Sequence, residues 1–268
     1  MSREFQIIHH TIDEGILKTA DARLRNQLIG CMHAHNELMI FNRILTFSLN
    51  DTGDGELHDA AKSVQMWSIL QILSAKLVET WKMLNERFLA AQPEDPALSR
   101  LEGEIIVSLE WLKSYFGTGK KLKSTSLLLI RDQTAFHYDK LNLRSASENL
   151  ADRERAIYLA QQPVNSLYYV GSALVFRTIF KIVAENAGNT ASDIYEESVK
   201  KGSDIAIEDA TSANYHMHML LYGLIKSLLE SLLGCPLETL DEVRINVADA
   251  PKPGMVGLPN FIDIGNSN

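Results

Sequence analysis

The sequence predicts an all-α protein: an up-and-down helical bundle with additional C-terminal helices and a short extended tail. Two observations predict this class. Apolar residues recur at steps of three and four along most of the chain, which is the spacing of one helix face. Strand-like alternation occurs only at Val243 to Val247, near the C-terminus. We expect one helical domain over residues 1–248 and an extended tail over residues 249–268.

Two long helices are expected in the first ninety residues. The first covers about residues 20–49, and its apolar face consists of Leu24, Leu28, Cys31, Ala34, Leu38, Phe41 and Leu45. A turn over residues 50–55 follows, where Asn, Asp and Gly are concentrated. The second helix carries an apolar stripe from Val64 to Phe88 and is expected to be the longest. Stripes of this length are typical of helices that pack in a bundle.

The third helix is expected to begin at Asp95 and Pro96, because Asp favours the N-cap position and Pro the first helical position. Its buried side would be formed by Leu98, Leu101, Ile105, Leu109 and Leu112. Gly117 and Gly119 end this helix. The next helix is expected over about residues 124–140.

The second half of the chain also predicts helices. A polar stretch covers residues 142–152, and helices resume near Arg153 and near Pro163. Residues 164–183 are apolar nearly all round, as in a central helix. A short helix near residues 192–200 and a long one near residues 204–233 follow, and Gly234 with Pro236 ends the second.

The charge of the chain limits its interactions with nucleic acid. A formal net charge of -8 excludes a protein that coats nucleic acid nonspecifically, because such binding requires clustered Lys and Arg. One local basic cleft is predicted at residues 117–123, where Lys120, Lys121 and Lys123 would bind substrate. The alternative is that these lysines belong to a solvated loop.

Cysteine content and hydropathy predict a cytoplasmic protein. Cys31 and Cys235 are the two cysteines, and each lies within or beside an apolar helical segment, which indicates buried free thiols. The residues from Met1 to Phe5 lack the apolar core of a signal peptide. No apolar run approaches the length of a membrane-spanning helix, so no membrane association is expected.

A candidate site lies in the segment from Ile130 to Asp139. Arg131 is a cation suited to phosphate, and His137 is able to move protons near neutral pH. On an α-helix, which turns by about 100° per residue, positions 131, 134 and 137 share one ridge. Thr134 would therefore lie between the two groups and contact the substrate.

On Arg131, Asp132 and His137 the chain resembles the HEPN superfamily, whose signature is an arginine, a polar residue and, a few positions later, a histidine in a helical bundle. The resemblance covers about the middle half of the chain. It implies a metal-independent RNA-cleaving site assembled across a homodimer. It also implies a role in toxin–antitoxin or anti-phage systems, with RNA as substrate and a cognate antitoxin or another protein as partner.

The resemblance implies a role for each motif residue. His137 would act as general acid and base, Arg131 would stabilise the phosphate, and Asp132 would orient Arg131. Tyr138 would add a hydrogen bond, and Glu79 is the acidic residue expected to support Arg131 or His137. The alternative is that Arg131 pairs with Glu79 or Asp132 while His137 is structural. The chain would then be a noncatalytic dimerisation or protein-interaction module.

No metal or other cofactor is predicted. The pairs His9-His10, His33-x-His35 and His216-x-His218 have spacings that direct neighbouring rings to different sides of a helix. His33 is expected to be a satisfied core histidine. Tryptophans at helical spacing are typical of a core and give little support to a small-molecule pocket.

Two arrangements are open for the tail. Pro251, Pro253 and Pro259 disfavour a helix there, while Phe261, Ile262 and Ile264 provide apolar anchors. The tail either wraps around a partner subunit or packs on its own chain.

Overall fold

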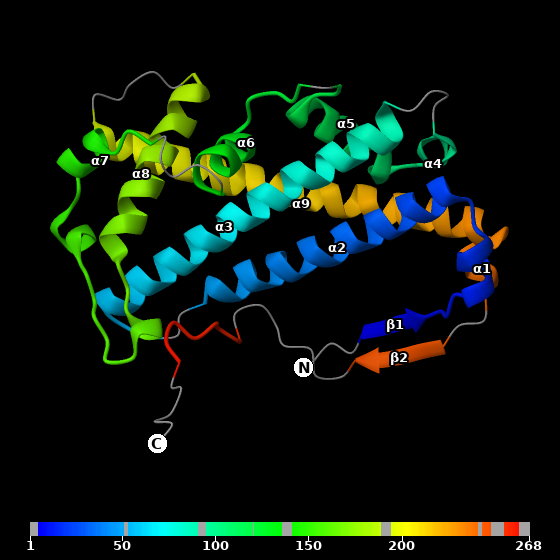
Figure 1. The fold of residues 1–268 in the computed structure, drawn as a ribbon, viewed down its shortest axis with the longest axis horizontal. Coiled ribbons are helices and arrows are strands. Elements are labelled where there is room, and N and C mark those ends of the chain that lie inside the picture. Colours follow the sequence, from blue (N-terminus) through cyan, green and yellow to red (C-terminus); the bar gives the residue numbers. More distant parts are fainter. Residues whose placement is uncertain are drawn as a thin grey trace. The chain divides into compact units, whose positions relative to one another are not determined.

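The computed structural model describes residues 5–50, 53–90, 95–119, 121–135, 141–188, 194–240, 243–247 and 255–262. Helices dominate these residues, and the predicted all-α fold is confirmed (Figure 1). The α-helices in the described ranges are α1 (Glu14–Thr19), α2 (Ala22–Ser48), α3 (Glu56–Leu84), α4 (Pro96–Ser99), α5 (Glu104–Phe116), α6 (Ser126–Ile130), α7 (Arg144–Glu148), α8 (Tyr169–Asn186) and α9 (Tyr195–Leu233). Short turns complete them: the π-helical η1 (Asn85–Leu89) and η2 (Arg131–Ala135), and the 3₁₀ turns η4 (Asp152–Arg155), η5 (Pro163–Asn165) and η6 (Leu237–Thr239).

The chain forms two compact units, each assembled from three segments. Unit 1 comprises Met1–Met39, Glu79–Lys123 and Asn214–Lys252, and unit 2 comprises Ile40–Val78, Ser124–Ala213 and Pro253–Asn268. The residues of α2, α3 and α9 are divided between the two units. A single domain over residues 1–248 stays a prediction.

Unit 1 has a core of aliphatic and aromatic side chains from α2, α3, η1, α5 and α9. Its fully or almost fully buried members are Leu28, Cys31, Leu38, Trp81, Leu84, Phe88, Leu112, Phe116, Met217, Leu220, Leu221, Leu224 and Leu228. On the predicted face of α2, Leu28, Cys31, Ala34 and Leu38 are buried, whereas Leu24, Phe41 and Leu45 are partly exposed. Burying each large side chain contributes roughly 1.5–3 kcal/mol relative to leaving it exposed.

Asp95 organises the polar part of unit 1. As predicted, it caps α4: its carboxylate accepts a hydrogen bond from the Ala97 amide at 3.0 Å, and Pro96 is the first helical residue. The same carboxylate accepts from Nε2 of Gln27 and from Nη2 of Arg23, each at 2.7 Å. Asp95 is only 4% exposed, so these bonds compensate for its lost hydration.

The helix predicted to run from Asp95 through Leu112 is broken. α4 ends at Ser99, and α5 begins after Gly103, which has a φ of +56°. Glycine adopts positive φ without steric cost, so it permits the change of direction. Gly117, with a φ of +78°, ends α5 as predicted.

Unit 2 has its own core, to which α3, α6, α8 and α9 contribute. The buried apolar residues include Ile69, Leu70, Leu73, Leu77, Leu127, Ile130, Phe176, Ile179, Phe180, Val183, Ala206, Ala210 and Ala213. The segment predicted as a central helix over residues 164–183 is α-helical only from Tyr169, where α8 begins, and only part of α8 is buried. On the part of α9 that belongs to unit 2, the buried apolar side chains are those of alanines, whose small size permits a close approach of the neighbouring helix.

Gly202 shows how close that approach is. A Cβ atom placed on Gly202 would lie 1.7 Å from the carbonyl oxygen of Phe180 on α8. The sequence predicted a break between residues 200 and 204, but α9 continues through Gly202 for a total of 39 residues. It is therefore longer than α3, with 29 residues, which was predicted to be the longest helix.

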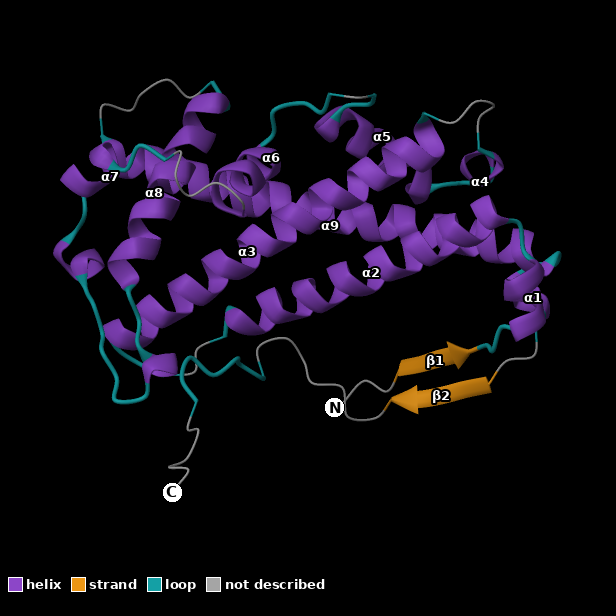
Figure 2. Ribbon diagram, in the orientation of Figure 1, coloured by secondary structure: helices purple, strands orange, loops and turns teal. Residues whose placement is uncertain are grey.

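The two strands form one antiparallel pair in unit 1. β1 (Phe5–His9) pairs with β2 (Val243–Val247), with Phe5 opposite Val247 and His9 opposite Val243 (Figure 2). The alternation in β2 is visible in the sequence. β1 was not predicted, because its partner lies at the other end of the chain.

Residues 255–262 of the C-terminal segment pack on their own chain, within unit 2. Asn165 forms a paired amide contact with Ile262: its Nδ2 donates to the Ile262 carbonyl at 2.8 Å and its Oδ1 accepts from the Ile262 amide at 3.0 Å. The ring of Phe261 meets the ring of His58 edge to face, 5.5 Å between centroids. Of the predicted anchors, Ile264 lies outside the described residues.

The middle of the chain contains less helix than predicted. Near Arg153 and Pro163 the structure has only the short 3₁₀ turns η4 and η5, while α7 lies in the stretch predicted to be a polar connection. Among the described helices, none combines the length and the apolar character needed to cross a membrane.

Candidate functional site

The motif segment begins with a well-formed helix start in unit 2. The Thr125 hydroxyl accepts a hydrogen bond from the Leu128 amide at 3.2 Å and caps α6. The Ser126 hydroxyl donates to Oδ2 of Asp209 on α9 at 2.5 Å. Leu127 and Ile130 are completely buried. These contacts fix the helix immediately before Arg131.

A π-helical turn occupies residues 131–135, which are the first part of the motif. A π turn widens the helix by one residue, so the α-helical spacing does not hold between Arg131 and Thr134, and position 137 lies outside the described residues. Thr134 is completely buried, and its hydroxyl donates to the Ile130 carbonyl at 2.5 Å. The Thr134 hydroxyl therefore forms its hydrogen bond within its own helix, and it is not accessible to a ligand.

Arg131 and Asp132 form an ion pair within the motif. Nη1 of Arg131 lies 3.0 Å from Oδ1 of Asp132. The arginine side chain is 19% exposed and the aspartate side chain 49%. The carboxylate therefore pairs with a largely covered guanidinium, and the orienting role of Asp132 stays a prediction.

Three of the predicted site residues lie outside the described residues: Lys120, His137 and Tyr138. Their roles stay predictions. Glu79, Lys121 and Lys123 belong to unit 1. The described motif residues Arg131, Asp132 and Thr134 belong to unit 2.

The two described lysines of the segment, Lys121 and Lys123, are both exposed, and Lys123 bonds to the backbone. Nζ of Lys123 donates to the Ser114 carbonyl at 2.6 Å, near the end of α5, where a cation is favourable. Lys121 is exposed. Glu79 forms an ion pair with Lys82 at 3.0 Å, so its predicted pairing with Arg131 or His137 stays a prediction.

The backbone of Gly117 and Gly119 is hydrogen-bonded by side chains at the end of α3 and in a second π-helical turn, η1. Nδ2 of Asn85 donates to the Gly119 carbonyl at 2.6 Å, and Oδ1 of Asn85 accepts from the Gly119 amide at 3.2 Å. Nε1 of Trp81 donates to the Gly117 carbonyl at 2.9 Å. These hydrogen bonds were not predicted, because neither side chain is distinguished by its spacing.

A buried ion-pair network in unit 2 was also missed. Nη1 of Arg177 lies 2.8 Å from each carboxylate oxygen of Glu154, and Nη2 contacts Glu196. Burial opposes the charge of Arg177, but hydrogen bonds to the two glutamates prevail, and the pKa of Arg177 is raised. A charged residue inside the apolar run of α8 was the available signal, since a buried arginine requires acidic partners.

The histidines do not behave as one group. His33 is wrongly predicted as a core histidine: its side chain is 74% exposed and lies 3.6 Å from Glu37. Nδ1 of His216 contacts the Ser108 hydroxyl at 3.0 Å, and its ring stacks on Trp111 with 4.6 Å between centroids. In the part of the chain that the structure describes, no three His, Cys, Asp or Glu residues are placed to hold a metal ion.

The cysteines are free thiols with different environments. Cys31 is completely buried, and burial raises the pKa of its thiol to about 12. Cys235 is only partly buried, which departs from the prediction.

Comparison with known proteins gave no match among protein-family models, curated proteins or solved structures.

Proposed function

We propose that this chain is a HEPN-like, metal-independent endoribonuclease whose site is formed by Arg131, Asp132 and His137. The observation that carries the proposal is the position of the Arg131–Asp132 ion pair in a π-helical turn. Such turns are rare and occur frequently at functional sites. The resemblance of the motif to the HEPN signature supports the same function.

The reaction requires one base, one acid and a group that stabilises charge. His137 removes the proton of a ribose 2′-hydroxyl, and the 2′-oxygen attacks the adjacent phosphorus. The bond to the 5′-oxygen breaks, and that oxygen leaves with a proton, which yields a 2′,3′-cyclic phosphate. Arg131 stabilises the phosphoryl oxygens, Asp132 orients Arg131, and Tyr138 adds a hydrogen bond.

The proposal includes a homodimer and a protein partner. One histidine per chain supplies only one of the two proton-transferring groups, so two motifs at a dimer axis would supply both. The net charge of -8 disfavours general RNA binding and favours a specific RNA target. A toxin or anti-phage role, with a cognate antitoxin or another protein as partner, is part of this proposal.

RNA cleavage in the presence of a chelator tests the activity. The wild type is expected to cleave a mixed RNA pool to products with 2′,3′-cyclic phosphate ends. Replacement His137→Ala should slow cleavage by about 100-fold or more, the range for losing a general acid–base group. His33→Ala is the matched control, because His33 is exposed and lies outside the motif.

All three proteins are first checked for folding by circular dichroism and for dimer formation by light scattering. If a folded, dimeric wild type leaves the RNA intact, or if both variants cleave equally well, the nuclease function is wrong.

The second candidate is a noncatalytic dimerisation or protein-interaction module. It is favoured by the pairing of Arg131 with Asp132 inside one chain and by the low exposure of the arginine. In that case His137→Ala lowers the melting temperature, and neither protein cleaves RNA.

A further inference from the structure

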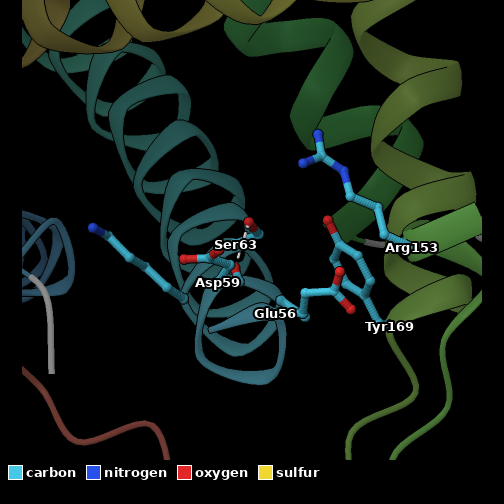
Figure 3. A pocket seen from close by; sticks show the side chains of 7 residues that line it. Glu56, Asp59, Ser63, Arg153 and Tyr169 are labelled. Carbon is cyan, nitrogen blue, oxygen red and sulfur yellow. Dashed lines mark hydrogen bonds between the residues drawn. The ribbon is translucent and has the colours of Figure 1, made fainter. Parts of the chain in front are cut away.

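A polar cavity of about 330 Å³ lies beside the first turns of α3 in unit 2. It is lined by Glu56, Asp59, Ala60, Lys62, Ser63, Arg153 and Tyr169. Figure 3 shows the Glu56 carboxylate, the Tyr169 hydroxyl and the Arg153 side chain around this space. We propose that the cavity binds a small zwitterion with the chemistry of a free α-amino acid.

The backbone position of Arg153 is fixed by the contacts of the residue that follows it. It belongs to η4, and the next residue, Glu154, is buried and bonded to Arg177. The Glu154 carboxylate also accepts a hydrogen bond from the Ala151 amide at 3.0 Å, which caps the turn. The backbone that carries Arg153 is therefore anchored in the core although its own side chain is exposed. Anchoring of this kind preorganises a site.

Tyr169 forms a second fixed wall. Its ring stacks on Trp67 of α3 with 5.9 Å between centroids and an interplanar angle of 10°. Burial raises the pKa of Tyr169, so its hydroxyl remains a hydrogen-bond donor at neutral pH. Ser63, on the neighbouring turn of α3, directs its hydroxyl to the Asp59 carbonyl at 2.8 Å.

Two charged groups of the cavity, those of Arg153 and Glu56, have no partner among the described residues. Among the described residues, the Arg153 guanidinium forms no hydrogen bond or ion pair, and neither does the Glu56 carboxylate. A guanidinium binds a carboxylate through two parallel hydrogen bonds, and a carboxylate binds an ammonium group. A ligand with both groups would pair with Arg153 at one end and Glu56 at the other.

The balance of charge selects this class of ligand. The lining contains two acidic residues, Glu56 and Asp59, and two basic residues, Lys62 and Arg153. A polyphosphate would meet the two carboxylates, and a polyamine would meet the guanidinium, so each would suffer repulsion. A zwitterion of no net charge matches both. The proposal is independent of RNA cleavage.

Isothermal titration calorimetry of the 268-residue chain with the standard L-amino acids tests the proposal. At least one amino acid should bind. Its binding should weaken by about tenfold or more in Arg153→Gln and in Glu56→Gln, the loss expected for one charge-assisted hydrogen bond. Arg144→Gln is the control, because Arg144 is 84% exposed and does not line the cavity.

Two derivatives of the amino acid that binds separate its two ends. The amide derivative lacks the carboxylate, and the N-acetyl derivative lacks the ammonium group. Both should bind at least about tenfold more weakly to the wild type. The proposal is overturned if no amino acid binds, or if Arg153→Gln and Glu56→Gln bind as tightly as the wild type. His137→Ala should bind normally, which keeps this result separate from the nuclease test.

Discussion

The imidazole ring of His35 on α2 meets the ring of His218 on α9 edge to face, with 4.8 Å between the ring centroids. Both residues belong to unit 1. Burial lowers the pKa of His35, and burial together with the proximity of His35 lowers the pKa of His218 to about 4. The folded protein therefore keeps this pair uncharged at a pH where free histidine is protonated.

This pair should make unit 1 sensitive to mild acid. In the unfolded chain His218 binds a proton near its ordinary pKa of 6.5, whereas the folded chain binds it only near pH 4. The unfolded state thus holds more protons between these values, so the free energy of unfolding falls as the pH decreases from about 6.5 to about 4. The loss is on the order of 2 kcal/mol, allowing for the partial exposure of the ring.

Urea unfolding at several pH values between neutrality and pH 4.5 measures the slope of the free energy of unfolding against pH. The variant His218→Gln should show a shallower slope, while His33→Gln should retain the slope of the wild type because His33 is exposed. Equal slopes in all three proteins would contradict the assignment to His218.

The Arg177–Glu154 pair should be a major determinant of the stability of unit 2. Its side chains are 7% and 11% exposed, so removal of one partner leaves a buried charge. Arg177→Met should lower the free energy of unfolding by roughly 3–5 kcal/mol. The double replacement Arg177→Met with Glu154→Leu should recover part of that loss, since no unpaired charge remains buried: Glu196, the other partner of Arg177, is 61% exposed. Chemical denaturation measures both, and a double variant no more stable than Arg177→Met would argue against this explanation.

Two helical glycines should respond in opposite ways to alanine. Gly202→Ala places a methyl group against the Phe180 carbonyl and should destabilise the protein by about 3 kcal/mol or more. Gly171 on α8 has no atom within 4 Å of the equivalent position, so Gly171→Ala should stabilise by roughly 0.5–1 kcal/mol. Thermal unfolding of both variants checks this. Similar losses at both positions would be inconsistent with a close helix contact at Gly202.

Local sequence signals predicted the parts of the fold that depend on neighbouring residues. The buried positions of α2, such as Leu28 and Leu38, follow from the helical repeat alone. The start of α4 follows from the preferences of Asp95 and Pro96 for the N-cap and the first turn. Each of these features is specified within a few residues.

Features that depend on distant residues were not predictable. Gly202 suggests a helix end by its propensity, but its role depends on the backbone of α8. The pairing of β1 requires β2, which lies more than two hundred residues away.

The candidate site illustrates the same limit. The identities of Arg131, Asp132 and His137 were legible in the sequence, but the π-helical turn at residues 131–135 was not. An α-helix and a π turn differ by one hydrogen-bond register, and the surrounding core selects between them. The low exposure of the Arg131 side chain and the burial of Thr134 therefore could not be predicted from residue spacing.

The pairing of β1 with β2 also constrains the order of folding during synthesis. Residues 5–9 leave the ribosome more than two hundred residues before their partner, Val243–Val247. While the residues between the two strands are made, the hydrogen-bonding edge of β1 is therefore without its partner strand. An open strand edge on a nascent chain is a template for wrong pairing. The strand pair can form only after residues 243–247 have left the ribosome.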